Sequence, residues 1–445
     1  MQGGHSPIAA THALGYLRGM SLALSLIFVL TYAAIVFEHP LGVNKSAAAL
    51  LGSGVLWVVY AMGGPDADAL NAELADSLTG TAQIVFFLIG AMTIVEVIDA
   101  HNGFEVLTRR ISTTRLPVLM WMIGLATFFL SAILDNLTTA IVMVSLMKRL
   151  LDKRDDRLLF AGIIVIAANA GGAWTPIGDV TTTMLWIGGQ ITTLAVMQGV
   201  FLASIVNLLV PLVVAAWMAS GRVVESPKAV ASDKSSTTAF EQTVMLLLGL
   251  GVLVLVPVFK AVTHLPPFMG VLLGLGVLWL VGDVMHKRKA EDDKQGLTLV
   301  SALGRIDMSA IVFFIGILLA VAVLEHSHIL PALARWLDHA VGRQDVIVLI
   351  IGLVSAVVDN VPLVAASMGM YDLAQYPPDS FLWEFMAYCA GTGGSILIIG
   401  SAAGVAAMGL EKIDFLWYLR KISALALAGY LAGALVYICQ YMLLH

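Results

Sequence analysis

Apolar runs of about 20 residues recur along nearly the whole chain, and each is long enough to cross a bilayer as a helix. Of the 445 residues, 59% are hydrophobic and only 12% are charged, which is too apolar for a soluble globular domain. The runs are continuous and lack the alternation of membrane β-strands. The sequence therefore predicts an all-α polytopic membrane protein.

Each half of the chain is expected to hold about five transmembrane helices, one of them broken, and one re-entrant hairpin. The expected spans are 16–37, 44–62, 82–99, 158–188, 192–218, 240–259, 267–285, 307–325, 381–408 and 417–442. An acidic polar stretch with Asp66, Asp68, Glu73 and Asp76 is expected to separate the second span from the third.

A hexapeptide inside apolar sequence occurs twice. Residues 131–136 read SAILDN and residues 355–360 read SAVVDN, so Asp135 and Asp359 stand in matching contexts. A charged Asp at bilayer depth costs roughly 2.5–3.5 kcal/mol on insertion scales, so two of them indicate function. The apolar arms around each motif are too short for two full crossings, which predicts a hairpin with its tip near residue 135 and another near 359.

A Gly-rich interruption follows each hairpin. Residues 169–179 read NAGGAWTPIGD, and residues 393–401 read GGSILIIGS. Gly and Pro should unwind the helix and free backbone carbonyls at these places. The two interruptions align three glycines each, Gly171, Gly172 and Gly178 with Gly393, Gly394 and Gly400.

The loops after the two hairpins differ in charge. Residues 148–157 hold five Lys or Arg side chains and are expected in the cytoplasm, whereas 371–384 hold none. The halves should therefore have opposite orientation, as in many secondary transporters. We expect a first inverted repeat over 1–218, a cytoplasmic linker over 219–238 and a second inverted repeat over 239–445.

These motifs, together with IVEVIDAH at 94–101, resemble NhaD-type sodium/proton antiporters of the wider ion-transporter superfamily that includes the ArsB and DASS-related transporters. The resemblance covers almost the whole chain from about residue 80. It implies an ion site at each hairpin tip and in the unwound helix beside it. It also implies a homodimer that moves its transport domain as an elevator.

Carried over by position, the resemblance implies sodium sites at Asp135 and Asn136, with Thr138 or Thr139 nearby, and at Asp359 and Asn360. The unwound helices supply the second set of positions, Asn169, Gly171, Gly172, Thr175, Pro176, Asp179, Thr181, Gly393, Gly394, Ser395 and Ser401. Carboxylate-transporting relatives are similar here but carry Ser at the hairpin tips. The Asp in both tips of this chain favours cation exchange.

Two interpretations apply to each polar site residue. Asp135 and Asp359 can exchange Na⁺ for H⁺, because desolvation favours the neutral carboxyl and bound Na⁺ favours the carboxylate; alternatively they cap helices. Asn136 and Asn360 can supply neutral oxygens or simply form turns. Asp179 can be a third carboxylate or an N-cap, and the aligned glycines are expected to act through position.

A polar group near the end of the third span offers further candidates. Glu96 is a candidate proton relay, and its alternative is an ion pair with Arg109 or Arg110. Asp99 and His101 are ordinary residues for a membrane boundary, although His101 could sense pH.

The sequence as a whole predicts a transporter that expels Na⁺ or Li⁺ in exchange for external H⁺ across a bacterial inner membrane. It is expected to be no enzyme, and to need neither a cofactor nor nucleic acid. One alternative is a dicarboxylate or arsenite transporter of the same superfamily, although neither motif holds Lys or Arg. The other is an intramembrane aspartyl protease, whose two Asp residues would meet directly.

Overall fold

The computed structural model describes residues 7–63, 66–108, 113, 115–223, 237–287, 289–290, 294 and 296–444. Nine helices in these ranges are long and apolar enough to cross a membrane. The prediction of an all-α polytopic membrane protein is therefore confirmed. Residues 224–236 of the expected linker, as well as Arg109 and Arg110, lie outside the described residues.

The chain forms two compact units, and each unit draws on both halves of the sequence. The first unit contains residues 1–85, 307–342 and 365–372. The second unit contains residues 86–306, 343–364 and 373–445. The division into two inverted repeats is a statement about internal symmetry and stays a prediction.

The first unit is built on helices from three separate segments of the chain. Its elements are α1 (Pro7–Val36), α2 (Glu38–Leu41), α3 (Lys45–Gly63), the start of α4 (Ala67–Ala100), α15 (Met308–His326), α16 (Ile329–Val341) and the end of α18 (Asn360–Met370). α3 packs closely against α15, because Gly316 faces the backbone of Ala49 without a side chain between them. The Trp57 indole N–H also donates to the carbonyl of Leu319 at 3.0 Å.

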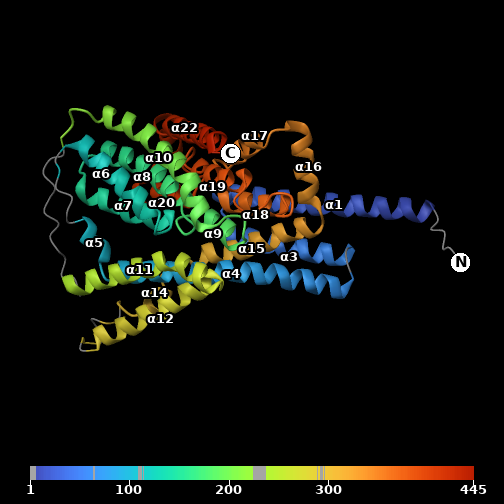
Figure 1. Ribbon diagram of the computed structural model, residues 1–445, viewed down its shortest axis with the longest axis horizontal. Helices are drawn as coiled ribbons and strands as arrows, with labels where there is room; N and C mark the ends of the chain where they lie inside the picture. The colour runs from blue at the N-terminus through green and yellow to red at the C-terminus, as the bar shows by residue number, and fades with distance from the viewer. Residues whose placement is uncertain are drawn as a thin grey trace. The chain divides into compact units, whose positions relative to one another are not determined.

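The second unit holds the two hairpins and the two broken helices (Figure 1). Its first group is the end of α4, α5 (Gly103–Thr108), α6 (Leu116–Ser131), α7 (Asn136–Leu150), α8 (Arg154–Ala173), α9 (Val180–Ile187), α10 (Thr193–Met218), α11 (Ala239–Thr263) and α12 (Pro267–His286). Its second group is α14 (Leu299–Leu303), α17 (Gln344–Val354), the start of α18, α19 (Phe381–Gly393), α20 (Ala402–Glu411), α21 (Phe415–Lys421) and α22 (Ser423–Leu444).

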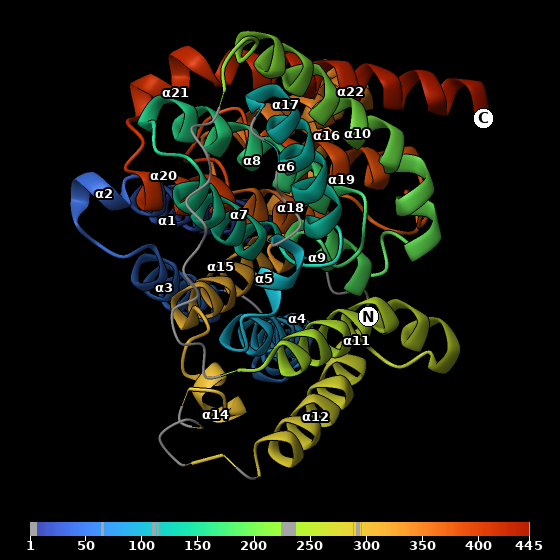
Figure 2. The same cartoon turned by 90° about the vertical axis from the view of Figure 1, so that its left-hand side faces the viewer.

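α8 is the central helix of the second unit. Its apolar stretch is 94% buried, which fits a sequence apolar on every side of the helix. α6, α7, α10, α19 and α20 pack around it, and Figure 2 shows α6, α7 and α20 beside it. Polar groups on α8 are therefore shielded from lipid.

Two expected element boundaries were wrong. The acidic stretch at 66–76 is no connection, because α4 runs without a break through residues 67–100. This stretch is rich in Ala and Leu, which are strong helix formers, and they outweigh the clustered charge. The last span starts later than expected, since α21 ends at Lys421 and α22 begins at Ser423.

Candidate functional site

The first hairpin tip lies between α6 and α7. α6 ends at Ser131 and α7 begins at Asn136, with Asp135 as its N-cap. The Asp135 carboxylate accepts hydrogen bonds from the Thr138 backbone N–H at 2.8 Å and from the Thr138 hydroxyl at 2.7 Å, one at each oxygen. Each carboxylate oxygen keeps a lone pair for another partner. Asp135 can therefore cap α7 and bind a cation at once.

The second hairpin tip repeats this design between α17 and α18. α17 ends at Val354 and α18 begins at Asn360. The Asp359 carboxylate accepts a hydrogen bond from the backbone N–H of Val361 at 3.2 Å. Asn360 is buried in the tip. Both predicted tips thus place an Asp directly before a helix start.

The first broken helix unwinds between Ala173 and Val180. Asp179 caps the restart at α9, where its carboxylate accepts from the Thr181 backbone N–H at 2.9 Å and from the Thr181 hydroxyl at 2.8 Å. The Thr175 hydroxyl donates to the carbonyl of Ala132 at 2.7 Å. The unwound segment is therefore bonded to the first hairpin tip.

Pro176 gives the unwound segment a further anchor, because its carbonyl accepts a hydrogen bond from the Thr183 hydroxyl at 2.9 Å. The proline itself has no N–H to donate, so it cannot continue the helix ladder of α8. The hydrogen bond to Thr183 and the missing N–H of Pro176 together hold the segment between α8 and α9 in a non-helical conformation.

The second broken helix unwinds between Gly393 and Ala402. Ser401 caps α20, and its hydroxyl accepts from the backbone N–H of Gly404 at 3.2 Å. Ser401 has φ −144° and ψ 155°, nearly the same conformation as Asp179 at −143° and 144°. The two breaks share one backbone design and differ in the chemistry of the cap.

Each hairpin tip is also held on its neighbouring broken helix by a serine. The Ser131 hydroxyl donates to the carbonyl of Ala168 at 2.6 Å. The Ser355 hydroxyl donates to the carbonyl of Ala390 at 3.1 Å. The expected site residues omitted these serines, although the repeated hexapeptide began with them.

The aligned glycines allow this close approach. A Cβ at Gly171 would overlap the carbonyl oxygen of Phe128, and a Cβ at Gly393 would overlap that of Gly352. Backbone oxygens would also lie within 3 Å of a Cβ at the other aligned glycines, Gly172, Gly178, Gly394 and Gly400. The glycines therefore permit close backbone approach, and their purely positional role stays a prediction.

One hydrogen-bond network joins the two broken helices. The Asn136 amide donates to Asn169 Oδ1 at 3.0 Å and to Asp179 Oδ2 at 2.6 Å. The Asn169 amide in turn donates to the hydroxyls of Ser395 at 3.1 Å and Ser401 at 2.9 Å. Asn169 on the buried α8 thus links the first hairpin tip to the second break.

The broken helices cross the second unit in opposite directions. At one end, Arg157 near the start of α8 pairs with Glu411 at the end of α20 at 3.1 Å. At the other end, the backbone N–H of Thr192, shortly after α9, donates to the Asp379 carboxylate just before α19 at 2.6 Å. The two unwound segments therefore meet between the ends.

The end that carries Arg157 is strongly basic, and we call it the basic end. Lys148 donates to the carbonyl of Leu410 at 3.3 Å, and Arg154 donates to that of Lys412 at 3.2 Å. Arg420 and Lys421 complete the last turn of α21 there. The positive-inside rule predicts that the basic end faces the cytoplasm.

The charges of both tip carboxylates act on Asp179 where the unwound segments meet. Asp179 is 2% exposed and within electrostatic range of both Asp135 and Asp359. Among the described residues, no Lys or Arg forms an ion pair with Asp135 or Asp179. The arrangement favours a bound cation over a bound anion.

Neutral oxygens would have to complete a cation shell. The part of the chain that the structure describes holds no group of three acidic, His or Cys side chains close enough for a metal ion. The Thr139 hydroxyl in the first turn of α7 is buried and has no hydrogen-bond partner among the described residues. Hydroxyl, amide and carbonyl oxygens are the ligands that hard cations accept besides carboxylates.

Glu96 pairs with a residue that the sequence did not suggest. Its carboxylate lies 3.3 Å from the Arg305 guanidinium, and both side chains are partly exposed. Arg109 and Arg110, the expected partners, lie outside the described residues. The charges of Asp99 and Asp135 also act on the Glu96 carboxylate. Glu96 is therefore coupled electrostatically to the first hairpin tip.

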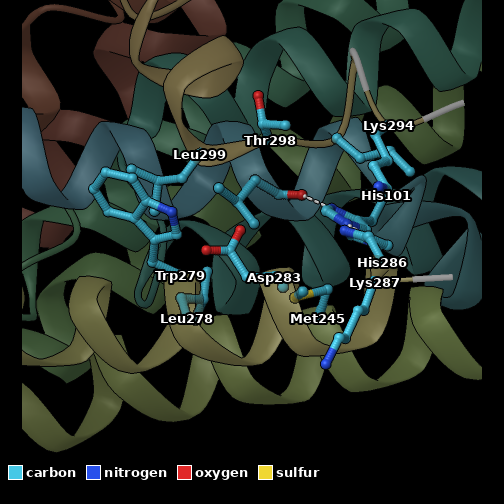
Figure 3. Close-up of a pocket in the computed structure, with 13 residues that line it drawn as sticks. His101, Met245, Leu278, Trp279, Asp283, His286, Lys287, Lys294, Thr298 and Leu299 are labelled. Atoms are coloured by element: carbon cyan, nitrogen blue, oxygen red, sulfur yellow. Dashed lines mark hydrogen bonds between the residues drawn. The ribbon is translucent and has the colours of Figure 1, made fainter. Parts of the chain in front are cut away.

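His101 lies apart from the hairpin tips, in a cavity of about 160 Å³ (Figure 3). Its Nδ1 donates to the carbonyl of Val97 at 2.6 Å, so its Nε2 accepts from His286 Nε2 at 3.2 Å. Burial lowers the pKa of His101 to about 4. The pH-sensing role of His101 stays a prediction, and this pKa keeps the residue neutral at the pH of most cells.

Comparison with known proteins gives one consistent group. The citrate transporter family model matches residues 32–391. Sodium/proton antiporter 1 of Arabidopsis thaliana is 51% identical over 424 residues, covering 95% of this chain and 73% of the relative. The Na⁺/H⁺ antiporters NhaD of Vibrio cholerae and Alkalimonas amylolytica are each 30% identical, covering 94% and 93% of this chain and 91% and 89% of their own.

Proposed function

Because this chain belongs to the NhaD-type sodium/proton antiporters, within the family of the citrate transporter model, and exchanges Na⁺ for H⁺ across a membrane, we propose that Asp135 and Asp359 are its exchangeable ligands. A carboxylate binds Na⁺ when ionised and loses it when protonated. One group at each tip then makes the two ions compete.

The observation that carries this proposal is the network from Asn136 through Asn169 to Ser401. It holds the first tip and both unwound segments together, with Asp179 accepting from Asn136 at 2.6 Å. Asn136, Asn360 and Asp179 are the fixed ligands in this proposal, and Thr138 and Thr139 complete the first half-site. The hydrogen bonds of Asn136, Asp179 and Thr138 hold the first half-site in place while the tip carboxylates change charge.

The proposed cycle uses alternating access. Two hairpins and two broken helices meeting between the ends of one unit fit a transporter that exposes its site to each side in turn. A proton moving inward through 100 mV releases about 2.3 kcal/mol, and a Na⁺ or Li⁺ ion moving outward costs the same amount. The membrane potential therefore drives the cation out when more than one H⁺ enters per cation. An elevator movement within a homodimer is our proposal for the step that carries the site.

The site argues against the two alternatives. Citrate and dicarboxylates are anions, and Asp135, Asp179 and Asp359 would repel them at the unwound segments. An aspartyl protease needs two carboxyl groups that share a proton. Here each tip Asp accepts hydrogen bonds from its own helix start, as a cap does. We therefore propose no anion transport and no catalysis by this site.

The proposed membrane environment and cellular location rest on the relatives and on the composition of the chain. The lipid bilayer is the partner of the apolar helices, and the site needs no cofactor or nucleic acid in this proposal. We propose the bacterial inner membrane as the location, because the bacterial NhaD relatives match 93–94% of the chain. Plant relatives match at higher identity, so membrane fractionation of the source cells would test this location.

Proteoliposomes with a pH-sensitive dye inside test the function. Adding Na⁺ or Li⁺ outside an acid-loaded vesicle should raise the internal pH, whereas K⁺ and citrate at matched ionic strength should not. The Asp135→Asn protein, shown to be folded by its melting curve, is the control. Citrate uptake without Na⁺-dependent proton flux would contradict the proposal.

A further inference from the structure

Glu384 is a buried carboxyl group that the ion site does not use. It lies in the first turn of α19 and is 8% exposed. The Tyr437 hydroxyl on α22 donates to its Oε2 at 3.1 Å. Among the described residues, the charge that acts on it is another acid, Asp379, and no cation pairs with it. A buried acid without a cation is a candidate for proton binding.

The surroundings of Glu384 are shaped for a carboxyl group. α10 contributes Gly199 at this point, and a Cβ there would overlap Glu384 Oε2 and Cδ. The Tyr437 ring stacks on Phe385, with ring centroids 5.1 Å apart and an interplanar angle of 8°. The hydroxyl that binds the carboxylate therefore has a fixed position, and the carboxylate fills the space that a side chain at position 199 would occupy.

A stripe of polar residues leads from Glu384 towards the ion site. Glu384, Tyr388 and Thr392 follow one another at intervals of four, so they lie on one face of α19. The Thr392 hydroxyl donates to the carbonyl of Tyr388 at 2.6 Å. Ser395 continues the stripe at the break, where its hydroxyl accepts from Asn169 at 3.1 Å.

Glu384 lies at the end of α19 opposite the basic end. α19 begins beside Asp379, which is bound to Thr192, whereas the helix that continues it ends at Glu411 beside Arg157. The loop that precedes α19 holds acidic residues and no Lys or Arg. If the basic end faces the cytoplasm, Glu384 lies on the side from which protons enter.

We propose that Glu384 is a proton-binding residue of the exchange reaction, which takes up protons from the external side. The proposal rests on the Na⁺/H⁺ exchange described above. An external proton binds the Glu384 carboxylate and gives the neutral acid. This proton then passes along the polar stripe of α19 to the tip carboxylate that releases Na⁺, and Glu384 returns to the carboxylate.

Replacing Glu384 separates proton uptake from sodium binding. In right-side-out vesicles, Glu384→Gln should slow Na⁺/H⁺ exchange by about tenfold or more at external pH 8, because the proton acceptor is lost. Exchange of ²²Na⁺ for unlabelled Na⁺ needs no proton and should stay within about twofold. Glu411→Gln is the matched control, since Glu411 is a buried acid that is paired with Arg157 at the basic end.

Tyr437→Phe should favour protonation of Glu384, whereas Glu384→Gln removes the proton-binding carboxyl group. The Tyr437 hydroxyl stabilises the carboxylate of Glu384, so its loss should favour proton binding. The external pH profile of Na⁺/H⁺ exchange should then move up by about half to one pH unit. This variant keeps Glu384 and its packing, so it tests the proposal even if Glu384→Gln does not fold.

Two results would overturn the proposal. Glu384→Gln could slow Na⁺/Na⁺ exchange as much as Na⁺/H⁺ exchange, which would make Glu384 structural. Alternatively, both substitutions could leave the external pH profile in place. A wild-type protein without Na⁺-dependent proton flux would instead refute the proposed function, and this outcome is visible before any variant is made.

Discussion

The two half-sites have the same backbone and different charge. Asp179 and Ser401 cap their helices with nearly the same φ and ψ, but the first cap is a carboxylate and the second a hydroxyl. Ser401 shows that a neutral side chain suffices to cap a restarting helix here. The charge of Asp179 is therefore available for ion chemistry, and the first half-site holds two carboxylates where the second holds one.

The two half-sites also contribute different groups to the hydrogen-bond network. Asn136 in the first tip is bonded to Asn169 and Asp179. The second half-site contributes Ser395 and Ser401 as acceptors for Asn169. The two half-sites therefore share their packing and differ in their hydrogen-bonding groups.

Neutralising the tip carboxylates should give the largest effect. Asp135→Asn and Asp359→Asn should each lower Na⁺-dependent proton flux on the order of 100-fold, since Asn neither releases a proton nor offers a charged ligand. Flux in proteoliposomes measures this loss, and melting curves control for folding. Full flux in Asp359→Asn with loss in Asp135→Asn would show that one half-site suffices.

Adding a methyl group at the paired glycines should cost similar stability in both halves. Gly171→Ala and Gly393→Ala each bring a Cβ onto a backbone oxygen, which should destabilise the protein by about 1–3 kcal/mol. Thermal unfolding in detergent measures the effect. Gly276→Ala is the control, because nothing lies within 4 Å of its Cβ position. Very different losses at Gly171 and Gly393 would contradict the shared packing.

Exchanging the cap chemistry should affect only one half-site strongly. Asp179→Ser keeps a capping oxygen but removes the charge, so the apparent Na⁺ affinity should fall about tenfold. Ser401→Ala removes a cap and an acceptor for Asn169, so the free energy of unfolding should fall by about 1 kcal/mol. Sodium titrations of transport and melting curves separate the two results. Equal losses of Na⁺ affinity would refute the asymmetry.

His101 lies outside both half-sites, and its replacement should have the smallest effect. Its pKa is lowered from 6.5 to about 4 by burial, so the folded state resists the protonation that the unfolded chain accepts. Stability should therefore fall as the pH drops from 6.5 towards 4, by on the order of 1 kcal/mol at pH 5.5.

His101→Gln should lack this acid-dependent loss and keep the wild-type pH profile of transport above pH 6. Melting temperatures at pH 7.5 and 5.5, compared with transport at the same values, check both statements. A shift of the transport profile in His101→Gln would support the pH-sensing role that the sequence predicted.

Local patterns were sufficient for much of the site. Gly and Pro marked the first break and Gly alone the second, because these residues change the local backbone. The repeated Asp marked both tips. α4 was less predictable, since its charged stretch resembles a loop by polarity although its residues favour a helix.

The amino-acid sequence by itself determined the membrane class, the helix breaks and the placement of Asp135 and Asp359, because hydropathy and backbone preference act over a few residues. The tertiary structure determined which distant side chains pair with one another. Glu96 meets Arg305 across 209 positions, and Asn169 meets Ser401 across 232. Such pairs depend on which faces of distant helices pack together, and only packing fixes that choice.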